Sequence, residues 1–497
     1  MQNDENRMTD EQGNAFEPNT EEAALQLRLA ERREARRLRQ ARRKRAVRRK
    51  RILLVLCGLL VILGGAGLWS RRHFPENTAV ETTVESTEAA ETETAVDEKQ
   101  ELLSEAALKA QQYDYDGAVA LLTDSSYAED AEVQAAVTAY TETQASCTAA
   151  NNQEITHIFF HSLIVDKNRA LTDDKLGHNF NSTMTTIPEF KAILEQLYAR
   201  GYVLVGLHDI AETETDADGT EHMVQKQILL PEGKKPIVIS QDDVCYYEYM
   251  TGRGFADKMV LDDAGTPKLQ YTDAEGNVSV GDYDLVPILD AFVEEHPDFS
   301  YHGHKAILAF TGYNGILGYR TDETYDPNSE NYDSGNTANE NIEADRETVK
   351  SLTKALKEDG YEFASHSWGH INFTERSVED LTRDTEKWKR NVESLLPDSC
   401  DILLYPFGAD IQDWHAYDET SDAKYQMLHN YGFRYFCNVD STQYWVQFGS
   451  DYMRQGRRNL DGYRLYESYS GAADRVSDIM DVQQVFDTDR PTPIEWN

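Results

Sequence analysis

Two short polar clusters contain the residue types that metal-dependent hydrolysis uses. Asp242 and Asp243 come just after the apolar run 237–239, and His366 and His370 come just after the stretch 361–364. Two adjacent carboxylates can divide their work, since one can bind a cation while the other takes a proton. Two histidines four residues apart can face the same way on one helical turn and hold zinc. The pattern predicts one carboxylate and two imidazoles on a divalent metal, with positions left for water and substrate.

Each cluster also has a plainer interpretation. Adjacent aspartates often form a solvated turn or a helix cap, and an HxxxH pair is often two surface residues. What favours a site is the position of both clusters at the ends of predicted strands. Active sites of parallel α/β folds lie at the carboxyl ends of their strands.

The elements that would position these clusters begin near residue 153, where apolar strands and helical patterns alternate. The predicted strands are 155–165, 202–207, 235–240, 305–310, 361–366, 401–407 and 433–439. The predicted helices are 187–201, with Thr186 as a cap, 285–295, 345–359, 377–395 and 421–431, and the polar stretches 262–284 and 321–341 read as surface insertions. This alternation predicts an α/β fold with a parallel sheet, either a barrel or a doubly wound sheet.

Residues 98–150 have a different character, with alanines and leucines at helical spacing. They predict two or three short helices that look like one tetratricopeptide-type helical pair. A single pair cannot bury its apolar face alone. Packing against the neighbouring domain is the favoured role, and binding of a protein partner is the alternative.

The N-terminal region predicts a membrane anchor. Residues 1–51 contain 15 Lys and Arg against 9 Asp and Glu, and residues 52–69 contain no charge. Eighteen apolar residues are just long enough for one transmembrane helix, and the basic flank 1–51 should stay in the cytoplasm. Residues 70–97, rich in Thr and Glu, predict a disordered spacer. The expected protein is a single-pass cell-membrane protein whose catalytic domain lies outside the cytoplasm.

The whole chain has a net charge of −39, which argues against nucleic-acid binding. The four cysteines after residue 70 are scattered, and no metal-binding CxxC pair occurs among them. Whether Cys400 and Cys437 form a disulfide is left open by the sequence.

Residues 153–470 resemble the polysaccharide deacetylase family, also called the NodB homology domain or carbohydrate esterase family four. Ser240–Asp243 matches its T/S-F-D-D motif, with Gln241 where Phe is usual, and His366–His370 matches H-S/T-x-x-H in full. Pro406-Phe407-Gly408 matches P-Y-G, and the run FFHSLIVD is similar to the exopolysaccharide-deacetylase branch. The resemblance implies a distorted (β/α) barrel of the NodB type over residues 151–497.

The family's site residues carry over by position. The resemblance implies that Asp243, His366 and His370 hold the metal, expected to be zinc with cobalt, nickel or manganese as alternatives. It implies that Asp242 is the general base acting on metal-bound water, and that the backbone N–H of Phe407 binds the oxyanion.

Two family features are missing at their usual places. Leu404 stands where an arginine often orients the base, and no late Leu-x-His motif follows His429 to supply the general acid. In the branch with an early histidine, that residue can take the acid's place, which makes His161 the candidate acid. A core histidine satisfied by backbone hydrogen bonds is an equal alternative for His161. Arg457, Arg458 and Asn459 resemble the branch's late strand, without an assigned role.

The reaction implied is removal of N-acetyl groups from hexosamines of a bacterial cell-wall or extracellular polysaccharide. Two alternatives remain: an O-acetyl-ester hydrolase on wall polymers, and a non-catalytic glycan-binding or scaffold protein.

Overall fold

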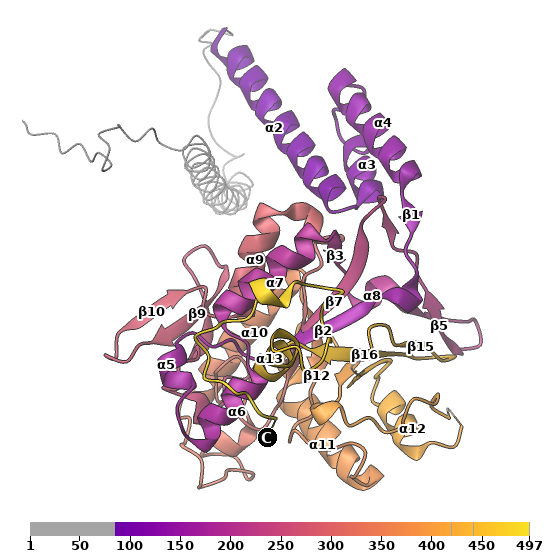
Figure 1. The fold of residues 1–497 in the computed structure, drawn as a ribbon. Helices are drawn as coiled ribbons and strands as arrows, with labels where there is room; N and C mark the ends of the chain where they lie inside the picture. Colours follow the sequence, from indigo (N-terminus) through magenta and orange to yellow (C-terminus); the bar gives the residue numbers. More distant parts are fainter. Residues whose placement is uncertain (1–84, 419, 441, 497) are drawn as a thin grey trace, which may run out of the picture. The chain divides into compact units, whose positions relative to one another are not determined.

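The computed structural model describes residues 85–418, 420–440 and 442–496, and within them seven parallel strands close into a barrel (Figure 1). The strands, in order around the barrel, are β2 (Thr156–Phe160), β7 (Lys235–Gln241), β11 (Ile307–Phe310), β12 (Glu362–Ser365), β13 (Ile402–Leu404), β14 (Tyr435–Val439) and β16 (Met453–Asn459). Closure comes from β7, whose last residues Ser240 and Gln241 pair with Ile307 and Leu308 of β11. The fold is therefore a barrel, as expected, and not a doubly wound sheet.

Most barrel strands are short apolar runs because helices and side chains cover both of their faces. Every residue of β2 and β11 is buried. Strand β16 is the exception, since its sequence MRQGRRN is polar and yet buried throughout. Its side chains find partners inside the fold: Arg454 pairs with Asp410, and Gln455 donates to the Ile155 carbonyl. Buried polar groups are tolerated where each is hydrogen-bonded in this way.

Helices surround the barrel (Figure 1). They are α5 (Lys167–Ala170), α6 (Lys175–Thr183), α7 (Ile187–Ala199), α8 (Leu207–Ile210), α9 (Leu285–Glu295), α10 (Ile342–Glu358), α11 (Val378–Asn391), α12 (Ala423–Asn430) and α13 (Gly462–Tyr469). The predicted cap of α7 is confirmed, because Thr186 and Glu189 form a reciprocal capping box. The apolar faces of α7, α9 and α10 join the largest core cluster around the barrel strands.

Further strands decorate the barrel. Strand β3 (Tyr202–Leu204) pairs with the start of β7, and β15 (Val446–Phe448) runs antiparallel to β16. The remaining strands form small antiparallel units: β1 (Thr148–Ala149) with β6 (Leu229–Leu230), β4 (Ala211–Thr215) with β5 (Glu221–Gln225), and β8 (Lys258–Leu261), β9 (Pro267–Thr272) and β10 (Val278–Gly281) in one meander. Most of the predicted insertion 262–284 lies in this meander.

Among the described residues, three helices precede the barrel: α2 (Glu85–Gln111), α3 (Tyr115–Thr123) and α4 (Ala131–Ser146). They bury apolar side chains in a core cluster shared with the barrel strands. The ring of Tyr113 stacks on Tyr301 at 6.2 Å, and the Tyr113 hydroxyl donates to the Asp298 carbonyl at 2.7 Å. The helical region thus packs against the barrel, and its apolar face is covered there.

The predicted spacer 70–97 needs a correction over its second half. Residues 85–97 belong to α2, so they are helical. The physical reason is that Ala and Glu, frequent in 85–97, are good helix formers. A helix already formed at residues 98–111 can extend into such a segment without the free-energy cost of nucleating a new helix. Residues 70–84 lie outside the described residues.

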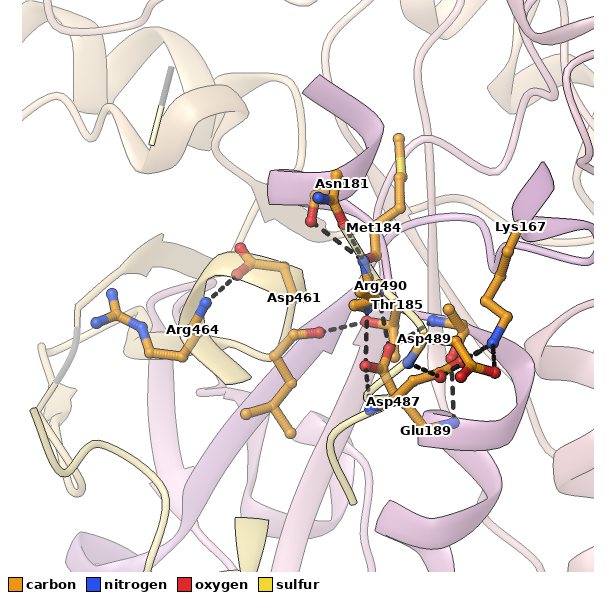
Figure 2. A network of polar contacts seen from close by, with 12 residues as sticks. Lys167, Asn181, Met184, Thr185, Glu189, Asp461, Arg464, Asp487, Asp489 and Arg490 are labelled. Carbon is orange, nitrogen blue, oxygen red and sulfur yellow. Dashed lines mark hydrogen bonds and ion pairs between the residues drawn. The ribbon is translucent and has the colours of Figure 1, made fainter. Parts of the chain in front are cut away.

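Buried polar contacts tie the C-terminal tail to α6 and α7 (Figure 2). Arg490 and Glu189 are both fully buried and pair at 2.7 Å. Arg490 also donates to the Met184 carbonyl at 2.7 Å. One residue along, the Thr185 hydroxyl donates to the Leu460 carbonyl at 2.6 Å, which connects this network to the end of β16.

Within residues 85–496, no helix is both long enough and apolar enough to cross a membrane. The basic tail 1–51 and the predicted transmembrane helix 52–69 lie outside the described residues. Cys400 and Cys437 are buried free thiols, so they are not joined by a disulfide.

Candidate active site

Asp243, His366 and His370 lie together at the carboxyl end of the barrel. Asp243 follows β7, and the two histidines follow β12. One ligand atom from each of the three lies within 4.8 Å of the others, a separation suited to a single cation. The sequence predicted this proximity, and the closure of the barrel produces it.

The backbone around the two histidines is a loop, so the expectation of a helical turn is wrong. Ser367 and His370 have φ values of 62° and 49°, in the left-handed region that residues other than glycine rarely adopt. Asp384 of α11 holds the loop, because its carboxylate accepts from the N–H groups of Trp368 and Gly369, both at 2.8 Å. The two rings still meet, with centroids 5.1 Å apart.

The donor set of this cluster fits a divalent metal. The Nδ1 of His366 lies 2.7 Å from the Leu404 carbonyl, which can only accept, so Nδ1 carries the proton and Nε2 is left as a ligand. Burial lowers the pKa of His366 to about 4, which keeps the ring neutral at physiological pH. For Asp243, Oδ1 accepts from Tyr247 at 2.5 Å and Thr311 at 2.6 Å, while Oδ2 faces His370. Such outer contacts typically orient metal ligands.

Asp242, the predicted base, is buried beside this cluster and paired with Arg457. The two guanidinium nitrogens Nη1 and Nη2 lie 2.6 and 3.0 Å from its two carboxylate oxygens. Burial alone would raise the pKa of Asp242, but the charge and the hydrogen bonds of Arg457 outweigh it and hold the pKa below its ordinary value. The carboxylate is therefore ionised and can accept a proton.

Sequence reasoning left Arg457 without a role. The expected arginine position holds Leu404, whose side chain is buried in the core cluster that α2–α4 share with the barrel strands. Arg457 reaches Asp242 from β16 instead, because β16 pairs with β2 and β2 pairs with β7. The signal was the polar run at 454–459, which has the length of a strand and too few apolar residues to be recognised as one.

The unusual Gln241 is also explained by its partners. Its amide Nε2 donates to both oxygens of the buried Asp284, each at 3.0 Å. Asp284 also accepts from the Tyr246 hydroxyl at 2.7 Å and from the Leu163 N–H at 2.9 Å. A phenylalanine at 241 could not donate to this carboxylate, so the glutamine supplies hydrogen bonds that the buried Asp284 would otherwise lack.

His161 follows β2 and lies at the same end of the barrel. In the β2–β7 register Phe160 is opposite Gln241, so the next residues, His161 and Asp242, are neighbours. The imidazole is half-buried, and it lies close enough to Asp242 and Asp243 that a charge on it would lower the pKa of both carboxyls. This proximity is what a general acid needs, and it distinguishes His161 from a histidine buried in the core. The acid role itself stays a prediction.

Phe407 lies in the turn Pro406–Gly408 after β13, with φ of 59°. Its ring packs edge-on against His370, with centroids 4.4 Å apart, while 69% of the residue is exposed. The turn therefore lies next to the candidate ligands. The proposed use of its backbone N–H for an oxyanion stays a prediction.

Fold and site together give a (β/α) barrel in which three side chains that could hold a metal ion lie beside an ionised carboxylate. Comparison with known families agrees. Residues 327–435 match the sequence model of the family described as polysaccharide deacetylase. The matched segment contains His366, His370 and Phe407, so the resemblance expected from the motifs is confirmed over residues 327–435. The predicted class of enzyme, a hydrolase that deacetylates polysaccharide, is thereby confirmed.

Several solved structures are similar over most of their length. A deacetylase of Streptococcus pyogenes, PplD, in complex with acetate, is 12% identical, covers 62% of this chain and 93% of its own, and has a TM-score of 0.30. A de-N-acetylase of Aggregatibacter actinomycetemcomitans is also 12% identical, with 62% and 95% covered and a TM-score of 0.33. IcaB of Ammonifex degensii is 11% identical, with 65% and 97% covered and a TM-score of 0.29. No curated protein matches this chain.

Proposed function

We propose that this protein removes N-acetyl groups from hexosamines of a cell-wall or extracellular polysaccharide and that it needs a divalent metal, zinc in the first instance. The observation that carries the proposal is the placement of the buried Asp242–Arg457 pair beside the cluster of Asp243, His366 and His370. A polysaccharide deacetylase domain with this donor set suits hydrolysis of an acetamide.

In this proposal Asp243, His366 and His370 hold the cation. When bound, it would supply Lewis-acid chemistry at the acetyl carbonyl and activate water. Asp242 takes a proton from the attacking water at a carboxylate oxygen, since each oxygen keeps acceptor capacity beside its arginine contact. The Phe407 N–H donates to the oxyanion, and His161 passes a proton to the leaving amine.

The deciding experiment measures acetate release from acetylated chitotetraose by the full chain. The protein is tested as purified, after chelation, and after zinc or cobalt is returned. Release that is lost on chelation and restored by metal supports the proposal, and Asp242→Asn should remain inactive at full metal loading. Release only from O-acetylated oligosaccharides would favour the ester hydrolase, and none from any substrate with one metal bound per chain would contradict both.

We also propose the predicted topology, with residues 52–69 in the membrane and the barrel outside the cytoplasm. The support is the uncharged run 52–69 and its basic flank. Protease added to intact cells should digest the barrel, and digestion only after lysis would contradict this topology.

A further inference from the structure

A groove of about 570 Å³ opens beside the candidate active site. Gly408, in its lining, belongs to the same turn as Phe407, whose ring packs on His370. Asn438, also in the lining, lies near the end of β14, and its carbonyl accepts from the Nε of Arg457 at 3.4 Å. Two of its lining residues thus belong to segments that contact His370 and Arg457, and we expect a polymer bound across the site to extend into the groove.

Two indoles form part of the groove. Trp414 is 69% exposed, and Trp445 lines the groove from the loop before β15. The loop that carries Trp414 is held by the buried Arg454 of β16, which donates to the carbonyls of Asp413 and His415 at 2.8 and 2.6 Å. A large aromatic surface held in place next to a catalytic centre is suited to a flat ring such as a pyranose, and an indole face also attracts a cation.

The charged lining residues are all acidic. They are Asp410, Asp413 and Asp440, and the described lining contains no Lys or Arg. Asp410 is neutralised, because Arg454 pairs with it at 2.8 Å. Asp413 is exposed and bonded to the His415 imidazole, and none of the ion pairs found in residues 98–496 involves Asp440. Two carboxylates therefore give the groove a negative field.

The indoles and the carboxylates of the groove together match a sugar ring that carries a positive charge.

We infer that this groove binds a hexosamine with a free amine, adjacent in the polymer to the acetylated residue that is being hydrolysed. The inference rests on the proposed function and narrows its substrate to partly deacetylated chains. The product of one hydrolysis carries the ammonium group that the groove accepts, so a first deacetylation favours a second next to it.

The test compares tetramers of defined sequence as substrates of the metal-loaded full chain. One is fully acetylated, and the others carry a single free amine at each possible position. We expect kcat/KM to be about tenfold higher for at least one of the amine-containing tetramers, since each exposed ion pair contributes up to about fivefold. The advantage should shrink at high salt. It should also largely disappear in the double variant Asp413→Asn/Asp440→Asn, whereas Asp116→Asn on α3 should preserve it.

A binding measurement separates this inference from the proposed function. The fully deacetylated tetramer has no acetyl group, so titration calorimetry with it measures binding without hydrolysis. Its Kd should weaken about tenfold in the double variant and severalfold in Trp414→Ala. Acetate release with no preference for an amine, or a Kd that the double variant leaves unchanged, would overturn the groove assignment. Groove-dependent binding with no acetate release from any tetramer would instead overturn the proposed function.

Discussion

Arg457 contacts both carboxylate oxygens of Asp242, at 2.6 and 3.0 Å, across 215 positions of sequence. Both side chains are almost fully buried, with 0% and 3% exposed. Removal of one partner would leave an uncompensated charge in the barrel, which typically costs about 3–5 kcal/mol. The pair should therefore contribute to the stability of the fold as well as to the proposed catalysis.

The first prediction concerns this pair. Arg457→Ala should lower kcat/KM for acetate release by about 10²-fold or more, because the base loses the contact that orients it and keeps it ionised. Arg457→Lys should restore part of the rate, since it returns the charge without the bidentate geometry. Metal content, measured alongside, should not change in either variant. A loss of rate that follows only the loss of metal or of folded protein would contradict an orienting role.

The second prediction concerns the metal ligands. His366→Gln should abolish stoichiometric binding of zinc, because the other two candidate ligands cannot complete the site. Metal per chain after chelation and reloading provides the measurement. The matched variant His178→Gln changes an exposed histidine of α6 and should retain one metal per chain. Equal loading of both variants would show that His366 is not a ligand.

The third prediction concerns the groups behind Asp243. Thr311→Val removes the donor 2.6 Å from Asp243 Oδ1 and leaves the shape of the side chain nearly unchanged. Outer contacts of this kind are typically worth about 10–100-fold in metal affinity. Competition with a zinc chelator should therefore give a Kd weaker by at least tenfold. An unchanged Kd would mean that Oδ1 needs no such support.

The fourth prediction tests His161 as the general acid. His161→Gln should slow acetate release from an N-acetylated sugar by about 10²–10⁴-fold, the usual contribution of proton transfer. Hydrolysis of 4-nitrophenyl acetate should change far less, because its leaving group departs without a proton. If both substrates slow by the same factor, His161 has another role.

The fifth prediction concerns the pH dependence of stability. It depends on a cluster of charged side chains at the opposite end of the barrel from the candidate site. His208 binds Glu362 at 2.6 Å and Asp401 at 3.0 Å, with His304 and Asp209 close by. Burial opposes the charged imidazole, but the carboxylates outweigh it and raise the pKa of His208 to about 10. Because the folded pKa exceeds the ordinary value of about 6.5, the stabilisation is full below pH 6.5 and is lost as the pH rises toward 10.

The pKa of Glu362 is shifted in the opposite direction from that of His208. Burial alone would raise its pKa, but His304 and His208 hold it below the ordinary value, so its contribution is lost in acid. The difference in Tm between the wild type and His208→Gln should therefore be largest near pH 5–6.5 and shrink toward pH 10. The His208 side chain is 44% exposed, so water weakens the effect and we expect a modest difference. A difference that is constant from pH 6 to 10 would contradict this account.

Much of the site could be predicted because its signals are local. Asp242, Asp243, His366 and His370 each follow a short apolar strand, and parallel strands bring their carboxyl ends to one edge. Strand order therefore indicated a parallel α/β fold, donor chemistry indicated the cluster of candidate ligands, and the family resemblance implied the barrel. The conformation of the 366–370 loop was not predictable from spacing, because Asp384 of a later helix imposes it.

The sequence by itself determined the ligand types, the order of strands and helices, and the polysaccharide deacetylase motifs, because each depends on residues close together in the chain. Only the tertiary structure decided which cation pairs with Asp242, the predicted base. The usual arginine position holds Leu404, and Arg457 takes over from a strand whose polar sequence carries no local strand signal. In the barrel β16 pairs with β2, and β2 pairs with β7. Arg457 is buried there, and its charge is stable in the interior because a carboxylate neutralises it. The need for a partner arises only when the chain is folded, because water solvates both charges in the unfolded chain.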